Sequence, residues 1–359
     1  MNARPALPRQ PEDLTPEWLT ACLQSTHPGI RITDLSFAGG HVSWASKYRV
    51  SVRYDDDDLR GDLPDQFCIK ASLDNPSRPD ADDTEPGPFS RLWVAEGHFY
   101  RDLAPELELV MPRSWYADTD ERRSAVIVME DLVAAGYSFG RFDRPLGADT
   151  VAAALEQAAV LHAQWWNDDR MLERPFLTDI LGPIFHALAV PANWDDVIQR
   201  PRCAGLPDWL RDRTVVARAV EAMVEHARGG PACVVHGDLH IGNLYFVGDT
   251  VGLLDFQVVS RGRPAVDVAY LLAGAMSTSD RRTHERELLE HYRQALTARV
   301  DSAPSLDELW LDYRRRLMHG VMNYFTPGDA DQSEDYKATV GGRFAAAAED
   351  LGMLSALGV

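Results

Sequence analysis

The chain has 359 residues, 45% hydrophobic and 25% charged, which is the composition of a globular protein large enough for two cores. Its formal net charge of −19 at pH 7 argues against a nucleic-acid partner, because phosphate backbones are bound through basic surfaces. No apolar run reaches the length of a membrane span, and the first residues are polar, so we expect a cytoplasmic protein without membrane contact. The composition leaves the oligomeric state open.

The first predicted elements are two strands joined by a glycine turn, between residues 35 and 54. Gly39 and Gly40 form the expected turn, with Ser43 close behind. Because glycine has no side chain, backbone amides at such a turn can approach a phosphate closely. An ordinary hairpin would have the same pattern.

Lysine is rare in this chain, which makes each lysine informative. Of 36 basic residues only Lys47, Lys70 and Lys337 are lysines, so arginine serves as the general surface cation. A lysine is then a candidate for a role that the planar guanidinium cannot fill. Lys70 ends residues 66–70, a β-branched and aromatic run that predicts a strand. A plain strand-edge lysine is the alternative.

A helix is predicted next, because apolar residues recur at spacings of three and four: Leu92, Ala95, Phe99 and Leu103. Glu96 lies beside this stripe and is the expected acidic partner of Lys70. Glu85 is a weaker candidate, since residues 74–88 are rich in Asp and Pro and indicate an exposed loop.

Residues 124–132 form an apolar, strand-like run that ends in an acidic pair. This run could form a hinge between two lobes that contacts a ligand, or it could be an ordinary buried strand. Beyond this run the periodicity becomes helical, so we expect one lobe over residues 1–132 and a second over 133–359.

The second lobe is predicted to be mostly helical. Asp149 or Thr150 can cap a helix in which His162 reads as a hydrogen-bonded core residue rather than a catalyst. Residues 167–206 have little periodicity. Further helices are expected at 207–226, 280–299, from the capping box Ser305–Glu308 onward, and around 333–354.

The most informative stretch is His-Gly-Asp-Leu-His-Ile-Gly-Asn at 236–243, followed by Leu-Asp-Phe-Gln at 254–257. The spacing of Asp238, Asn243 and Asp255 matches the polar positions of phosphoryl-transfer sites. A carboxylate can take the proton of an acceptor hydroxyl, and amide and carboxylate oxygens are ligands of Mg²⁺. The pattern predicts Asp238 as the base and Asn243 and Asp255 as the magnesium ligands.

This segment resembles the aminoglycoside phosphotransferase and choline kinase-like family more than the protein kinases. Gly237 stands where protein kinases have Arg, Gln257 stands where they have Gly, and both motifs follow apolar pairs. The Leu-Asp-Phe-Gln variant is closest to the ecdysteroid kinase-like branch. The resemblance implies an α+β, two-lobe protein-kinase-like fold, with an antiparallel sheet lobe and a larger, mostly helical lobe.

The resemblance also implies roles for the other candidates. Lys70, paired with Glu96, would grip the phosphates of ATP, or of GTP as the alternative, beneath the turn of Gly39, Gly40 and Ser43. A second set would contact the adenine through its backbone: Met129, Glu130 and Leu132. His236 would fix the catalytic loop, and Asp267 would either brace that loop or simply cap a helix.

The expected substrate is the hydroxyl group of a small molecule. Residues 167–206 and the last helices supply aromatic candidates for the acceptor pocket: Trp194, Tyr324 and Phe325, with Tyr336 as a further wall residue. Such walls favour an uncharged, partly apolar alcohol. A cationic acceptor of the aminoglycoside or choline type is one alternative, and a non-catalytic nucleotide-binding relative is another.

Overall fold

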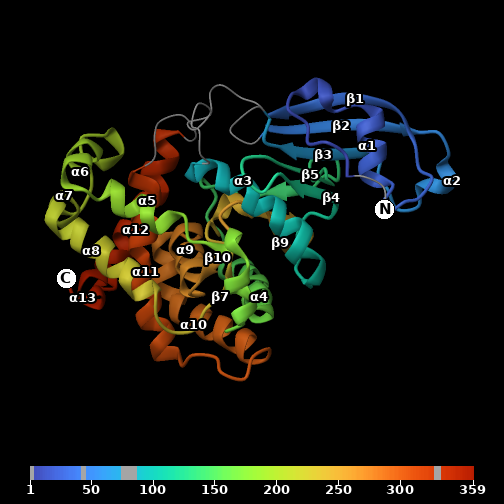
Figure 1. The fold of residues 1–359 in the computed structure, drawn as a ribbon. Helices are drawn as coiled ribbons and strands as arrows, with labels where there is room; N and C mark the ends of the chain where they lie inside the picture. Colours follow the sequence, from blue (N-terminus) through green and yellow to red (C-terminus); the bar gives the residue numbers. More distant parts are fainter. Residues whose placement is uncertain (1–3, 42–45, 74–86, 327–332) are drawn as a thin grey trace. The chain divides into compact units, whose positions relative to one another are not determined.

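The computed structural model describes residues 4–41, 46–73, 87–326 and 333–359 (Figure 1). The chain divides into two compact units. The first comprises Met1–Leu107, Met111–Ser138 and Asp255–Gln257, and the second comprises Glu108–Val110, Phe139–Leu254 and Val258–Val359. The three residues Asp255–Gln257 therefore belong to the first unit, although the chain on both sides of them belongs to the second.

The first unit contains a five-stranded antiparallel sheet with the strand order β1-β2-β3-β5-β4. Its strands are β1 (Ile32–His41), β2 (Ser46–Tyr54), β3 (Gln66–Ala71), β4 (Ser114–Thr119) and β5 (Ala125–Glu130). The strands expected from residues 35–54, 66–70 and 124–132 are confirmed. Its helices are α1 (Pro16–Leu23), α2 (Asp57–Arg60) and α3 (Pro88–His98), and α3 continues through a π-turn, Phe99–Leu103.

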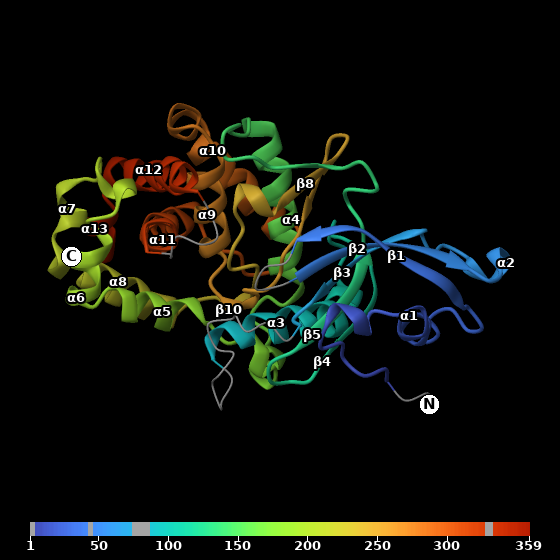
Figure 2. The same cartoon turned by 90° about the horizontal axis from the view of Figure 1, so that it is seen from above.

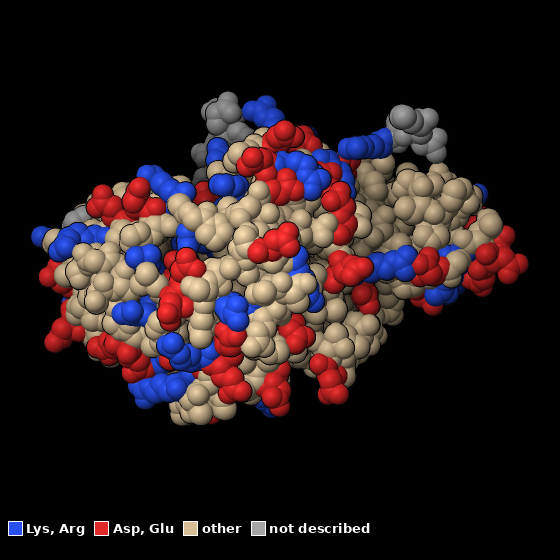
Figure 3. Space-filling view, turned by 90° about the horizontal axis from the view of Figure 1, so that it is seen from below, with Lys and Arg blue, Asp and Glu red and all other residues tan. Residues whose placement is uncertain are grey.

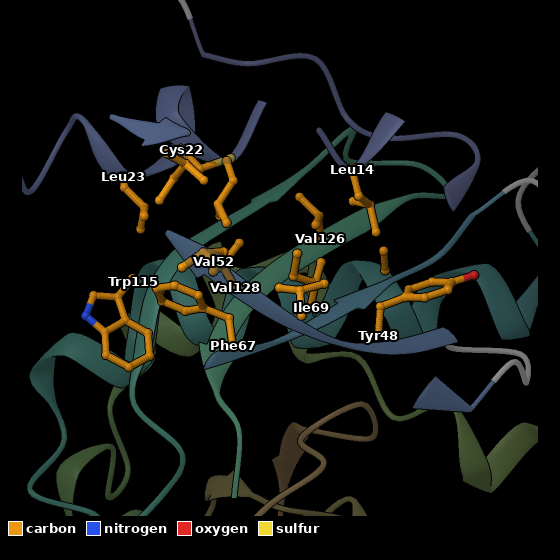
Figure 4. Packing of buried hydrophobic residues seen from close by; sticks show 14 of the residues in the cluster. Leu14, Cys22, Leu23, Tyr48, Val52, Phe67, Ile69, Trp115, Val126 and Val128 are labelled. Carbon is orange, nitrogen blue, oxygen red and sulfur yellow. The ribbon is translucent and has the colours of Figure 1, made fainter. Parts of the chain in front are cut away.

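Alternation along the strands places α1 and α3 on opposite faces of this sheet. Phe67 and Ile69 of β3, with Val126 of β5, point into one apolar cluster beneath α1 (Figure 4). The residues between them point the other way, where Trp93 of α3 packs on Ala125. Residue 70 follows Ile69 in the alternation, so its side chain lies on the α3 face.

The second unit is mostly helical, as expected. Its longer helices are α4 (Ala148–Gln164), α8 (Arg213–Ala227), α9 (Ala265–Ala275), α10 (Thr278–Thr297), α11 (Leu306–Phe325) and α12 (Glu334–Asp350). Its shorter helices are α5 (Leu181–Leu188), α6 (Pro191–Val197), α7 (Asp208–Arg211) and α13 (Met353–Leu357). Helices α9, α11 and α12 pack side by side, and α4 packs against α10 (Figures 1 and 2).

Two short antiparallel strand pairs of this unit flank the candidate catalytic loop, residues 236–243. Strand β7 (Cys233–Val235) pairs with β10 (Ser260–Gly262), and β8 (Leu244–Val247) pairs with β9 (Thr250–Leu253). The loop of residues 236–243 thus runs from the end of β7 to the start of β8. The short strand β6 (Ser138–Phe139) borders β8.

Two of the expected helix boundaries are wrong. The helix expected over 207–226 is interrupted, because the Asp212 side chain accepts hydrogen bonds from the backbone amides of Thr214 and Val215 and starts α8 anew. Helix α4 begins at Ala148 after Gly147, so neither Asp149 nor Thr150 caps it. The capping box that starts α11 is confirmed.

The surface carries both signs of charge. Figure 3 shows one face on which Lys and Arg side chains are interspersed with Asp and Glu. The four cysteines are free, and three of them are buried. Among the helices of the described residues, we find none with the length and apolar character that crossing a membrane requires.

Candidate active site

Gly39 and Gly40 lie inside strand β1 rather than in the expected turn. The strand register shifts just before Gly39, whose φ of 144° favours glycine. A Cβ on Gly40 would lie 2.5 Å from the carbonyl oxygen of Lys47 on the paired strand, so a side chain there would force the strands apart. The connection falls on residues 42–45, and Ser43 therefore lies outside the described residues.

The ammonium group of Lys70 is held between two carboxylates. Nζ lies 2.6 Å from Oε2 of Glu96 and 2.7 Å from Oδ1 of Asp255. Lys70 is 5% exposed and Glu96 is 2% exposed, so this cluster is removed from water. Burial alone would lower the pKa of Lys70, but the charges of Asp255 and Glu96 outweigh burial and raise it. The lysine therefore stays protonated, and the structure contains the expected Lys70–Glu96 pair.

Asp255 joins this cluster from an unusual backbone conformation. Its φ is 69°, in the left-handed region that residues other than glycine seldom occupy, although Asp tolerates it better than most. Its Oδ2 lies 3.4 Å from Nζ of Lys47, the residue opposite Lys70 on β2. The next residue, Phe256, is fully buried and stacks on Phe99 with ring centroids 3.9 Å apart. This packing anchors the segment that carries the Asp255 carboxylate.

The hinge candidates lie at the end of β5. Met129 and Leu132 are buried, and Glu130 is partly exposed. Asp131, between them, accepts a hydrogen bond of 2.7 Å from Nε of Arg49 on β2. The segment is therefore fixed to the sheet, while its contact with an adenine stays a prediction.

In the second unit, Asp267 binds the loop and does not cap its helix. The N-cap of α9 is Pro264, and Asp267 lies in the first turn. Its two oxygens accept hydrogen bonds from the backbone amides of His236, at 2.7 Å, and Gly237, at 2.8 Å. The sequence left open whether Asp267 braces the loop or caps a helix, and in the structure it contacts the loop.

His162 supports Asp267 from α4. Its Nε2 lies 2.9 Å from Asp267 Oδ2, and its Nδ1 lies 2.8 Å from the hydroxyl of Tyr292. His162 and Asp267 have no exposed surface, and the interpretation of His162 as a hydrogen-bonded core residue is confirmed. Burial alone would raise the pKa of Asp267, but the hydrogen bonds from His162 and the loop hold it below its ordinary value.

His236 and Gly237 fix the backbone that leads to Asp238. His236 Nε2 donates to the carbonyl of Leu254, the residue before Asp255, at 3.0 Å, and its Nδ1 accepts from the Asp238 amide at 3.3 Å. Gly237 has φ of 79°, and a Cβ there would lie 2.5 Å from the carbonyl oxygen of Val258. Only glycine fits this position without displacing the backbone.

Asn243 is oriented by Asp238. Its Nδ2 donates to the backbone oxygen of Asp238 at 2.9 Å and lies 3.3 Å from the carboxylate Oδ2. Because the amide nitrogen faces Asp238, the amide oxygen faces away and is available as an oxygen ligand. Asn243 is 6% exposed, so this orientation is protected from water.

Four further residues lie around the Asp238 carboxylate: His240, Tyr270, Asn323 and Tyr336. The sequence predicted Tyr336 as a wall of the acceptor pocket and assigned the other three no role in the site. Asn323 Nδ2 donates to Asp238 Oδ1 at 3.4 Å and to the Tyr270 hydroxyl at 2.6 Å. His240 Nδ1 accepts from the Gly242 amide at 2.9 Å, so the neutral ring carries its proton on Nε2, 3.6 Å from Asp238 Oδ2. The Tyr336 hydroxyl lies 3.3 Å from His240 Nδ1. Of the three residues that the sequence analysis missed, only His240, the second His of the loop motif, could have been noticed in the sequence.

The three aromatic pocket candidates do not come together. Trp194 has no exposed surface, and its indole N–H donates to the carbonyl of Leu210 at 2.7 Å, so it is a core residue between α6 and α8. Phe325 is also fully buried. Tyr324 is the one of the three that reaches the Asp238 network, because its hydroxyl lies 3.3 Å from that of Tyr336.

Two family models match separate parts of the sequence. The model described as the ecdysteroid kinase-like family matches residues 45–164, and one described as uncharacterized oxidoreductase dhs-27 matches residues 216–324. A kinase-like protein of Caenorhabditis elegans, itself named as uncharacterized, is 25% identical over 273 residues, which cover 70% of this chain and 68% of the relative. The ecdysteroid kinase-like model and the kinase-like relative confirm the resemblance expected from the motifs.

Two solved structures share the architecture. An ethanolamine kinase of Plasmodium vivax is 11% identical, with a TM-score of 0.52 over 96% of this chain and 90% of that one. A choline kinase of Cryptosporidium parvum is 12% identical, with a TM-score of 0.52 over 94% of this chain and 97% of that one. The chain has the protein-kinase-like fold. At these identities the likeness establishes the fold alone, and activity has to be argued from the site.

Proposed function

We propose that this protein is a small-molecule kinase that transfers the γ-phosphoryl group of ATP to the hydroxyl of an uncharged, partly apolar alcohol. GTP is the alternative donor. The observation that carries the proposal is the Asp238 carboxylate, which two amide side chains orient on a loop that is itself held by Asp267. A fixed carboxylate beside neutral polar groups is suited to accept a proton from a hydroxyl.

Asp238 acts as the general base in this proposal. Asn243 and Asn323 each donate toward one of its oxygens, which sets the direction of the remaining lone pairs. His236 and Gly237 hold the backbone beneath it, so the carboxylate does not have to reorganise when the acceptor hydroxyl approaches. The proton of the hydroxyl passes to a carboxylate oxygen as that hydroxyl attacks phosphorus.

The residues present fit magnesium and a nucleotide. Among the described residues no group of three or more His, Cys, Asp and Glu side chains forms a metal cage. Mg²⁺ bound with a nucleotide uses only one or two protein oxygens, together with phosphates and water, and there it neutralises charge on the transferred group. Asn243 offers its outward-facing amide oxygen, and Asp255 offers a carboxylate. Lys70, kept protonated by its two acidic neighbours, supplies a cation for phosphate oxygens.

The neighbours of Asp238 support the choice of acceptor. The described side chains that face its carboxylate are an amide pair, an imidazole and phenols, rather than further carboxylates. A cationic acceptor gains affinity from several acidic groups, whereas an alcohol needs hydrogen-bond partners and apolar contact. Tyr270, Tyr324 and Tyr336 provide both.

The test is turnover of ATP over a panel of apolar alcohols and of choline-like and kanamycin-like cations. Phosphorylation of apolar alcohols is expected, and Asp238→Asn should lower kcat by about 10²–10⁴-fold while nucleotide affinity stays nearly unchanged. Asp249→Asn, an exposed position in the β8–β9 turn, is the matched control and should be silent.

Turnover of Asp238→Asn within a few-fold of wild type would rule out the base assignment. Phosphorylation of the cations alone would overturn the choice of acceptor and leave the kinase assignment standing. Nucleotide binding without transfer to any member of the panel would favour a non-catalytic relative.

A further inference from the structure

The second unit contains a cavity of about 470 Å³ that the proposed reaction does not use. Its walls come from residues 171–185, the end of α8, the β7–β10 pair and α11. Gly237, next to Asp238, forms part of the wall, but the Asp238 side chain does not line the cavity. The volume lies in the range of about 300–1,000 Å³ typical of small-molecule sites.

The lining of this cavity is basic, in a protein whose net charge is −19. Five of the lining residues are arginines, and one, Asp179, is acidic. Arg263 pairs with Asp312, Arg228 pairs with Glu225, and Arg174 lies over the ring of Trp165, so these three have partners within the protein. Of the other two arginines, Arg261 is exposed, so the remaining charge within the cavity is that of Arg316 on α11.

Arg316 of α11 lines the cavity and has no hydrogen bond or ion pair with any residue that the structure describes. Burial lowers the pKa of its guanidinium to about 10, and the opposing charge of Asp179 does not restore it. Arg316 is partly exposed, and none of its nitrogen atoms is buried without a partner, so its donors face the cavity and are available to a ligand. A bound carboxylate or sulfate would supply two parallel hydrogen bonds.

His319, one helical turn further along α11, has one unpaired ring nitrogen, because its other nitrogen bonds the backbone of Gly237. It is 6% exposed and lines the same cavity, and its Nε2 has no hydrogen-bond partner among the described residues. Its ring is fixed by edge-to-face contacts with Phe185, at 5.1 Å, and Tyr270, at 5.3 Å. Buried polar atoms in folded proteins are nearly always paired. The unpaired Nε2 of His319, close to Arg316 on the same helix, therefore indicates a missing ligand.

The rest of the lining is apolar. Met171, Leu177, Phe185, Met223 and Val258 all contribute to the wall. An inorganic anion would leave this surface without contacts, whereas a ligand with a hydrocarbon part would bury it, at about 25 cal/mol per Å². The cavity thus combines an anion-binding end with apolar sides.

We propose that this cavity is a binding site for a small organic anion, a carboxylate or sulfate with an apolar body, whose charged group pairs with Arg316 beside His319. The proposal concerns binding alone, and it stands whether or not Asp238 transfers phosphate.

The experiment is calorimetric titration of the full chain with three probes: octanoate, octanol and inorganic sulfate. Octanoate should bind at least about tenfold more tightly than either of the others, because only octanoate offers both charge and an apolar chain. If octanol bound as tightly as octanoate, the proposed recognition of a negative charge would be wrong. If sulfate bound as tightly as octanoate, the proposed contact with an apolar body would be wrong. No binding of octanoate would overturn the proposal altogether.

Arg316→Met tests the residue assignment. Octanoate affinity should fall about tenfold to a hundredfold, the range expected for losing a hydrogen-bonded charge. Without ligand, the variant should melt near the wild-type temperature, because Arg316 is partly exposed and has no ion pair to lose. Arg218→Met, at an exposed position on α8, removes the same charge outside the cavity and should change neither property. Equal octanoate affinity in Arg316→Met and wild type would refute the assignment.

His319→Phe is the second variant, and it keeps the proposal testable if Arg316→Met fails to fold. It preserves the aromatic contacts with Phe185 and Tyr270 while removing Nε2. The other ring nitrogen donates to the Gly237 backbone, so Nε2 can donate to a carboxylate only when the ring takes up a proton. Octanoate binding should therefore be accompanied by proton uptake and should weaken several-fold in the variant, whereas octanol binding should not weaken. A parallel loss for both probes would mean that the substitution only disturbs packing, and it would count against the site.

Discussion

Replacing Lys70 by Met should destabilise the first unit by about 3–5 kcal/mol, the cost of leaving buried charges without their partner. The structure predicts this size because Lys70 and Glu96 are 5% and 2% exposed, and because Nζ contacts Glu96 and Asp255 at 2.6 and 2.7 Å. Without the ammonium, two carboxylates remain close together in a site that water does not reach.

Lys47→Met is the matched control. Lys47 is opposite Lys70 on the neighbouring strand, but its side chain is 43% exposed and lies 3.4 Å from Asp255. An exposed pair of this kind contributes about 0–1 kcal/mol, so this variant should be nearly as stable as wild type. The assay is urea-induced unfolding followed by tryptophan fluorescence. Equal losses from both substitutions, or a loss below about 1 kcal/mol for Lys70→Met, would refute the reasoning.

The loss should also depend on pH. Burial raises the pKa of Glu96, and removing Lys70 removes the main opposing influence. A carboxyl whose pKa is higher in the folded than in the unfolded state destabilises the fold as pH rises from the unfolded pKa through the folded one. Lys70→Met should therefore be closest to wild type near pH 5 and furthest from it near pH 8. The double variant Lys70→Met/Glu96→Gln should recover stability at the higher pH.

Two further predictions concern the metal ligand and a helix cap. Asp255→Asn, which keeps a residue that tolerates the φ of 69°, should reduce the gain in ATP affinity that Mg²⁺ provides by at least about tenfold, measured by calorimetry with and without the metal. An unchanged magnesium effect would remove Asp255 from the metal site. Ser305→Ala should lower the free energy of unfolding by about 1 kcal/mol, because the Ser305–Glu308 capping box at the start of α11 is lost. A thermal melt indistinguishable from wild type would contradict that contribution.

Local patterns predicted those parts of the structure that local physics determines. The strand that ends near Lys70 and the helix that carries Glu96 follow from periodicities of two and of three to four residues, so their facing side chains could be expected to pair. The capping box of Ser305 is equally local. In contrast, the break at Asp212 depends on one side chain competing with the helix for backbone amides, and periodicity does not register that competition.

The parts that could not be predicted depend on contacts between distant residues. Asn323 reaches Asp238 across 85 positions of sequence, and no spacing rule connects them. Composition also misled: Trp194 was assigned to a pocket because it is aromatic, yet a large ring with a satisfied N–H fills a core equally well. Gly39 and Gly40 indicated a turn, whereas Gly39 provides a positive φ at a register shift and Gly40 allows the close approach of two strands.

Because Asp267 hydrogen-bonds both the loop of residues 236–243 and His162 of α4, substitutions in these parts of the chain should depend on one another during evolution. Its carboxylate serves two loop amides and His162, and His162 in turn reaches Tyr292 on α10. None of these groups can be replaced singly without leaving a buried donor or acceptor unmatched. Lineages that keep a working loop should therefore change positions 162, 267 and 292 together, and an alignment should show them as one covarying set although the chain separates them widely.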